Sequence, residues 1–95
     1  MLQTMAQPSS LLLALLRVPA ILPIYGTGKS QFHQDVRDRL VTKPVKPSSR
    51  MALWPAHEIH AINAARIAGK SPDEIRALVV KLEADRVAQA DRLAG

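Results

Sequence analysis

Apolar side chains recur every four residues between positions 30 and 40. Phe32, Val36 and Leu40 stand at i, i+4 and i+8, a spacing that places side chains on one face of a helix. Ser30 precedes them and belongs to the residue class that caps helix N-termini. The pattern predicts a helix that Ser30 caps, with a polar face that carries Gln31, His33, Gln34 and Arg37.

A shorter helix is predicted just before this one. Pro19 suits the first turn of a helix that runs to Ile24, because the missing N–H of proline costs nothing there. Residues 25–28, Tyr-Gly-Thr-Gly, then supply a tight turn, so the two helices form a helix-turn-helix. The preceding apolar run, Leu11–Leu16, fits a helical turn or a short buried strand equally well.

Two short strands are expected to follow. Residues 42–46 and 50–54 are rich in strand-forming side chains, and the polar residues 47–49 separate them. Pro44 and Pro47 cannot donate ladder hydrogen bonds, which predicts an exposed hairpin edge. The hairpin has the outline of a wing beside the helix-turn-helix.

Two further helices complete the predicted fold. Pro55 opens a third helix that Gly69 ends near Ala68. Its buried stripe is predicted to comprise Ile59, Ile62 and Ile67.

The last helix has the clearest start signal in the chain. Ser71 and Glu74 stand three residues apart with Pro72 between them, which is the form of a capping box. An apolar stripe follows and comprises Ile75, Leu78, Val79 and Leu82. The stripe can pack on its own domain or serve oligomerisation, and Arg86 interrupts it.

Together these elements predict a mainly α-helical fold with a small β-hairpin wing. Residues 1–14 are expected to form a flexible N-terminal arm, residues 15–70 a winged helix-turn-helix, and residues 71–95 an additional C-terminal helix and tail. The uncharged arm is a candidate to contact a neighbouring copy. The six-residue apolar run is too short to cross a membrane.

Positive charge is concentrated in the middle of the sequence. The net charge is +5, yet residues 17–70 carry nine Lys or Arg against three acidic residues, whereas residues 1–16 carry no charge. Such a distribution favours a polyanionic partner that contacts the central segment.

No residue pattern indicates an enzyme, a metal site or a cofactor. The chain has no cysteine, which removes thiolate chemistry. The Gly28-Lys29-Ser30 sequence lacks the earlier glycine of a phosphate loop, because Pro23 occupies that position. His57 and His60 share a helix face, but two histidines do not complete a metal site. We therefore expect no catalytic residue and no metal or cofactor.

The basic and polar residues of the second helix and the hairpin instead predict contact with double-stranded DNA. Gln31 and Gln34 can pair with adenine edges and Arg37 with guanine. The full set of candidate DNA-binding residues is Lys29, Ser30, Gln31, His33, Gln34, Arg37, Lys43, Lys46 and Arg50, and Arg39 belongs to the same basic run. Those on the hairpin are expected to hold phosphates or to enter the minor groove.

The segment from Leu16 to about Lys70 resembles the AlpA-like, excisionase-related family of phage and integrative-element regulators. The likeness rests on Leu16–Pro19, Gly28–His33, and Lys43–Lys46 followed by Arg50 and Trp54. Asp35 departs from the family pattern, which often has an apolar residue there. The family has a winged helix-turn-helix of the MerR type.

Residues 62–71 and the capped helix after them look like the branch of this family found in proteobacterial mobile elements. The resemblance implies a recombination directionality factor that binds attachment-site DNA beside an integrase, favours excision, and acts in the bacterial cytoplasm on the nucleoid. An AlpA-like transcriptional regulator is the first alternative, and a protein-interaction module that uses the C-terminal helix is the second. Copies of the protein are expected to associate head to tail along DNA. Removal of residues 72–95 would then abolish cooperative binding and leave the affinity for a single site nearly unchanged.

Overall fold

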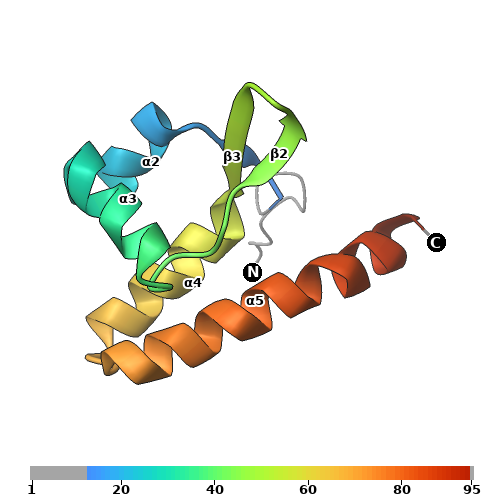
Figure 1. Cartoon of the computed structure of the whole chain (residues 1–95). Coiled ribbons are helices and arrows are strands. Elements are labelled where there is room, and N and C mark those ends of the chain that lie inside the picture. The colour runs from blue at the N-terminus through green and yellow to red at the C-terminus, as the bar shows by residue number, and fades with distance from the viewer. Residues whose placement is uncertain (1–12, 95) are drawn as a thin grey trace, which may run out of the picture.

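The computed structural model describes residues 13–94, which form a mainly helical fold with a small antiparallel sheet (Figure 1). The sheet has three strands in the order β1-β3-β2, and the arrangement is compatible with a winged-helix-like fold. Residues 1–12 of the predicted arm lie outside the described part of the chain. The elements are β1 Leu15–Leu16, α2 Val18–Tyr25, α3 Lys29–Arg37, β2 Val45–Ser48, β3 Met51–Pro55, α4 Ala56–Ile67 and α5 Pro72–Ala94.

The two predicted N-terminal helices are present as α2 and α3. Gly26 joins them with a left-handed backbone at φ 87°, a conformation that glycine adopts without steric cost. The expected cap is wrong, because Gly28 is the N-cap of α3, no side chain caps this end, and Ser30 lies inside the first turn. The helix also ends at Arg37, three residues before Leu40.

The predicted hairpin is formed by β2 and β3, with its turn at residues 49–50. The predicted bounds are wrong for the first strand, which runs over residues 45–48 and not 42–46, so Pro47 and Ser48 belong to the strand and not to the loop. Strand β2 lies at the sheet edge, as expected for a strand that contains Pro47, whereas Pro44 precedes it. The third strand comes from the apolar run whose conformation the sequence left open. Leu15 pairs with Pro55 and Leu16 with Trp54, which supports the strand interpretation for these two residues. Leu15 is nevertheless 47% exposed, so this strand is not buried.

The core is built around three aromatic rings that meet edge to face. The ring centroid of Phe32 lies 5.4 Å from that of Tyr25 and 5.0 Å from that of Trp54. The Trp54 indole also donates a 2.7 Å hydrogen bond to the carbonyl of Thr42. These contacts join α2, α3 and β3 in one cluster with Ile59 and Ile62 of α4.

Ile67 does not belong to the buried stripe predicted for α4. It is 88% exposed, whereas Ile59 and Ile62 are fully buried. Ile67 follows Ile62 by five residues, which turns its side chain about 140° around the helix axis. The predicted stripe is therefore wrong at this position.

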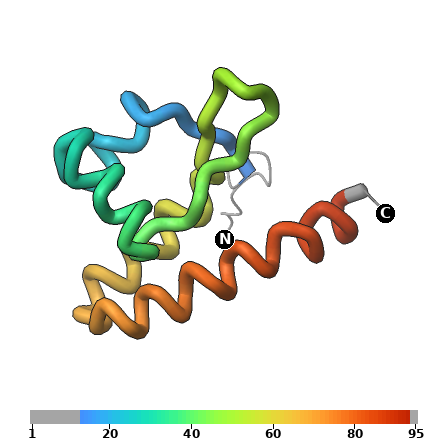
Figure 2. The backbone as a smooth tube through the Cα atoms, in the orientation of Figure 1, coloured from blue at the N-terminus to red at the C-terminus, as the bar shows by residue number. Residues whose placement is uncertain are grey.

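The capping box predicted at the start of α5 is confirmed. The Ser71 N–H donates to Glu74 Oε1 at 2.8 Å, and the Glu74 N–H donates to Ser71 Oγ at 3.2 Å. The bond from the Ser71 N–H also lowers the pKa of Glu74. Gly69, between α4 and α5, has a left-handed backbone at φ 77°. Figure 2 shows the sharp turn of the chain between these two helices.

The apolar stripe of α5 packs on its own domain. Ile75 and Val79 are buried in the core, and Leu78 and Leu82 pack against it. This burial favours packing on the same domain for Ile75 and Val79. The use of the stripe for oligomerisation stays a prediction, and Leu78 and Leu82 are only partly buried. Within residues 13–94, no helix has the length and apolar content needed to span a membrane.

Candidate nucleic-acid interface

One face of α3 presents polar side chains away from the core. Ser30, His33, Gln34 and Arg37 follow the i, i+3, i+4, i+7 spacing of a single helix face, and all except the half-buried His33 are exposed. Phe32 and Asp35 point to the opposite side and are buried. Helix α3 therefore combines a fixed inner face with an outer face of hydrogen-bonding groups.

A hydrogen bond between the side chains of Gln34 and Arg37 fixes their positions on this face. Arg37 Nη2 donates to Gln34 Oε1 at 2.9 Å, and Gln34 Nε2 donates to Asp38 Oδ1 at 3.1 Å. All three residues are exposed. The arrangement holds an amide and a guanidinium side by side, and these groups are suited to adenine and guanine edges.

Gln31 differs from the other candidates on α3 because it serves a buried carboxylate. Gln31 Nε2 donates to Asp35 Oδ1 at 2.7 Å, and the Tyr25 hydroxyl donates to Asp35 Oδ2 at 2.6 Å. Burial, then the hydrogen bond to Asp35, raises the pKa of Tyr25. Gln31 is thus engaged in joining α3 to α2.

Asp35 belongs to a wider network of side chains that joins α3 to α2 and α4. The guanidinium of Arg66 lies 4.1 Å from the centroid of the Tyr25 ring and donates to the Tyr25 carbonyl at 2.7 Å. This connection from α4 through Tyr25 to Asp35 fixes the orientation of α3. This network was not predicted from the sequence. The available signal was Asp35 itself, an acidic residue close to the apolar positions of a predicted helix.

Within residues 13–94, the basic candidates on α3, on the hairpin and on the segment between them form no ion pair. Among residues 13–94, ion pairs join Arg39, Arg76, Lys81 and Arg86 to acidic side chains. No ion pair within that part of the chain engages the exposed candidates Lys29, Arg37, Lys43, Lys46 and Arg50. Their charge is free to attract a polyanion.

Arg39 is removed from the predicted basic surface. Its backbone has φ 65°. Its guanidinium donates from Nη2 to Glu83 Oε1 at 2.8 Å and from Nη1 to Glu83 Oε2 at 3.1 Å. The side-chain hydrogen bond to Glu83 raises the pKa of Arg39. The pairing explains why Arg39 differs from its basic neighbours, and sequence spacing alone could not reveal a partner 44 residues away.

Helix α5 holds the segment that connects α3 to β2. Arg76 Nε donates to the Asp38 carbonyl at 2.9 Å, and Arg86 Nη2 donates to the Lys43 carbonyl at 2.8 Å. Between them, Glu83 accepts the Lys43 N–H at 2.8 Å in addition to the Arg39 side chain. We call these three α5 side chains, Arg76, Glu83 and Arg86, the α5 clamp. The clamp fixes how the outer face of α3 is placed relative to the hairpin.

Glu83 makes the clamp sensitive to acid. The hydrogen bond from Arg39 holds the pKa of Glu83 below its ordinary value of 4.5. A carboxylate with a lowered folded pKa stabilises the fold above the ordinary value, and this contribution is lost as the pH falls through the lowered one. We expect the unfolding midpoint in urea to drop as pH falls from about 5 to 3.

The matched variant for this prediction is Glu83→Gln, which keeps the shape of the side chain and removes its titration. Its urea midpoint should change less with pH over the same interval than that of the unaltered chain. Parallel curves for the two proteins would show that other carboxylates carry the acid sensitivity.

The histidines and the remaining acidic residues do not converge. Within residues 13–94, no three His, Cys, Asp or Glu side chains form a group that could hold a metal ion. The carboxylate of Asp35 is occupied by Tyr25 and Gln31. No family model, curated protein or solved structure matches the chain.

Proposed function

We propose that this chain is a sequence-specific DNA-binding protein with a winged helix-turn-helix. The observation that carries the proposal is the set of exposed, unpaired cations on α3 and the hairpin, next to an ordered amide and guanidinium on the outer face of α3. In winged helix-turn-helix proteins such a helix reads the major groove and the wing contacts the backbone or the minor groove. Gln34 and Arg37 would read bases, and Lys43, Lys46 and Arg50 would bind phosphates.

Within this class we favour an excisionase-like recombination directionality factor. Its role would be to bind attachment-site DNA and to promote integrase-mediated excision of a mobile element, without catalysis of its own. The resemblance of residues 16–71 to the excisionase-related family supports this choice. An AlpA-like transcriptional regulator would use the same residues at a promoter.

Gel-shift titration separates these functions. Purified protein would be titrated on attachment-site, promoter and random fragments from its own genetic element at two salt concentrations. Stepwise complexes confined to attachment DNA support the directionality factor, and one discrete complex on a promoter supports the regulator. Absence of salt-sensitive binding to all fragments would contradict the DNA-binding proposal.

Variants in the same assay distinguish base readout from phosphate contact. Gln34→Ala and Arg37→Ala should each weaken specific binding by about 1–3 kcal/mol and leave binding to random DNA nearly unchanged. Lys46→Ala should weaken binding to specific and random DNA alike and reduce the dependence of affinity on salt. Lys81→Ala on α5 is the matched control, because this lysine is exposed and paired with Asp85. The opposite pattern would mean that the hairpin, and not α3, reads the sequence.

A further inference from the structure

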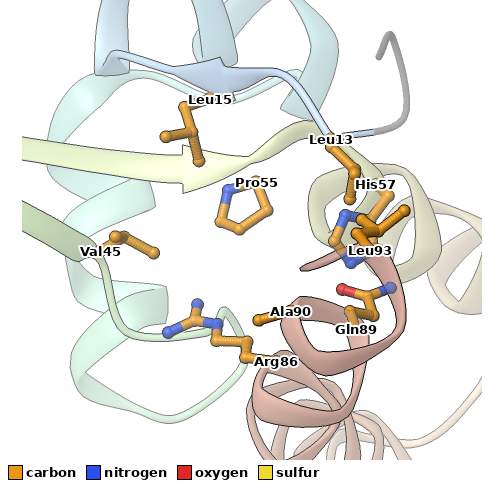
Figure 3. A pocket seen from close by; sticks show the side chains of 9 residues that line it. All are labelled: Leu13, Leu15, Val45, Pro55, His57, Arg86, Gln89, Ala90 and Leu93. Carbon is orange, nitrogen blue, oxygen red and sulfur yellow. The ribbon is translucent and has the colours of Figure 1, made fainter. Parts of the chain in front are cut away.

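An apolar groove of about 380 Å³ lies between the sheet and the C-terminal half of α5 (Figure 3). Leu15 and Val45 form its wall on the sheet side, and Ala90 and Leu93 face them from α5. The complete lining is Leu13, Leu15, Val45, Pro55, His57, Arg86, Gln89, Ala90 and Leu93. The groove is separate from the outer face of α3.

The walls of the groove leave large aliphatic side chains exposed. Leu15 is 47% exposed and Leu93 is 61% exposed. The one guanidinium in the lining, that of Arg86, is already bonded to Glu58 and to the Lys43 carbonyl. Burial of aliphatic surface contributes about 25 cal/mol per Å², so the groove favours an apolar occupant over a charged one.

The described chain begins at this groove. Leu13, the first described residue, is part of the lining. The twelve residues before it, MLQTMAQPSSLL, contain no charged side chain and include Leu11, Leu12 and Met5. Leucine and the unbranched, adaptable methionine are the side chains that fill an irregular apolar space. Twelve residues can extend up to about 40 Å, which is ample for the segment to fold back along the groove.

We propose that this groove is the docking site for residues 1–12 of the same chain. Leu11 and its neighbours occupy the space between Leu15 and Leu93 and join the C-terminal half of α5 to the sheet. The short connection through Leu13 favours the same chain over a second copy, because it gives the segment a high effective concentration at the groove. The inference does not depend on DNA binding and can fail or succeed independently of the proposed function.

Disulfide trapping tests the proposal. Because the chain contains no cysteine, the two introduced thiols are the only ones that can react. A Leu11→Cys, Ala90→Cys double variant places a thiol in the segment and another in the groove. The matched control, Leu11→Cys with Ala88→Cys, moves the second thiol about 200° around α5, to an exposed position facing away from the groove. Under mild oxidation the 11–90 pair should form an intramolecular disulfide at least an order of magnitude faster than the 11–88 pair.

The outcomes of this experiment are distinct. A faster intramolecular 11–90 disulfide supports the proposal. A 11–90 disulfide found only between two chains would overturn it and assign the groove to a second copy. Equal rates for the two pairs would show that the segment has no preference for the groove.

A second measurement does not depend on the geometry of the two thiols, which can slow disulfide formation even between neighbouring segments. Deletion of residues 1–12 should shift the methyl NMR signals of Leu15, Val45 and Leu93 and leave those of the core residues Ile21 and Ile62 in place. Unchanged groove signals, together with equal disulfide rates, would overturn the proposal. Shifts throughout the core would also contradict it, because they would assign the segment a general folding role.

Discussion

Arg86→Met should lower the free energy of unfolding by about 3–5 kcal/mol, the usual cost of leaving a buried ion without its partner. Both oxygens of Glu58 accept hydrogen bonds from Arg86, at 2.7 and 2.8 Å, and the Glu58 side chain is fully buried. The pairing raises the pKa of Arg86. Methionine preserves much of the side-chain volume and removes the charge, so the variant isolates the ion pair. Urea unfolding followed by the fluorescence of the buried Trp54 measures the change.

The double variant Glu58→Met, Arg86→Met is the matched control. Replacement of both partners by apolar side chains removes the uncompensated charge and should recover most of the lost stability. A single Arg86→Met change that costs less than about 1 kcal/mol would place this pair among ordinary surface ion pairs. Failure of the double variant to recover stability would assign the effect to the Lys43 carbonyl contact.

A chain ending at Ser71 should fail to fold cooperatively. Truncation there removes Ile75 and Val79 from the core, each worth about 1.5–3 kcal/mol of burial, and also takes the partner of Glu58. Domains of this size are stabilised by about 5–15 kcal/mol in total. Burial of the two side chains and the broken ion pair together amount to about 6–11 kcal/mol, which is comparable with that whole stability. Far-UV circular dichroism during heating should show a broad, non-cooperative change.

The control for this truncation is a chain ending at Ala88, which retains the buried part of α5 and the whole α5 clamp. It should melt cooperatively, because the core residues and the partner of Glu58 are all retained. Cooperative unfolding of the chain ending at Ser71 would contradict the structural role of α5. In that case removal of α5 could affect cooperative DNA binding alone, as the sequence had suggested.

Most elements of the fold could be predicted from the sequence because their signals are local. The capping box of Ser71 and Glu74, the glycine turn before α3 and the proline-bearing edge strand each depend on residues a few positions apart. Two local signals were misleading. Ser30 is a good capping residue, yet Gly28 begins α3, and Ile67 continues an apolar spacing that the helix turns toward solvent.

The candidate site also has a part that the sequence predicts and a part that it does not. The exposed face of α3 and the unpaired cations of the hairpin follow from helical periodicity and charge, so sequence reasoning could find them. Gln31 and Arg39 were grouped with them because spacing does not show what a polar side chain binds. In the structure, Gln31 donates a hydrogen bond to Asp35 and Arg39 donates to Glu83, so both side chains are engaged within the protein.

The sequence by itself determined the order of the helices and of the hairpin, the positive charge of the central segment and the face of α3 that points outward. Only the tertiary structure decided that α5 belongs to the core, that Arg86 neutralises the buried Glu58, and that the α5 clamp fixes the link between α3 and the hairpin. The physical reason is the range of the interactions. Helical periodicity and capping act within a turn or two of chain. The Glu58–Arg86 and Arg39–Glu83 pairs instead join residues 28 and 44 positions apart, and these partners become neighbours only after the chain has folded.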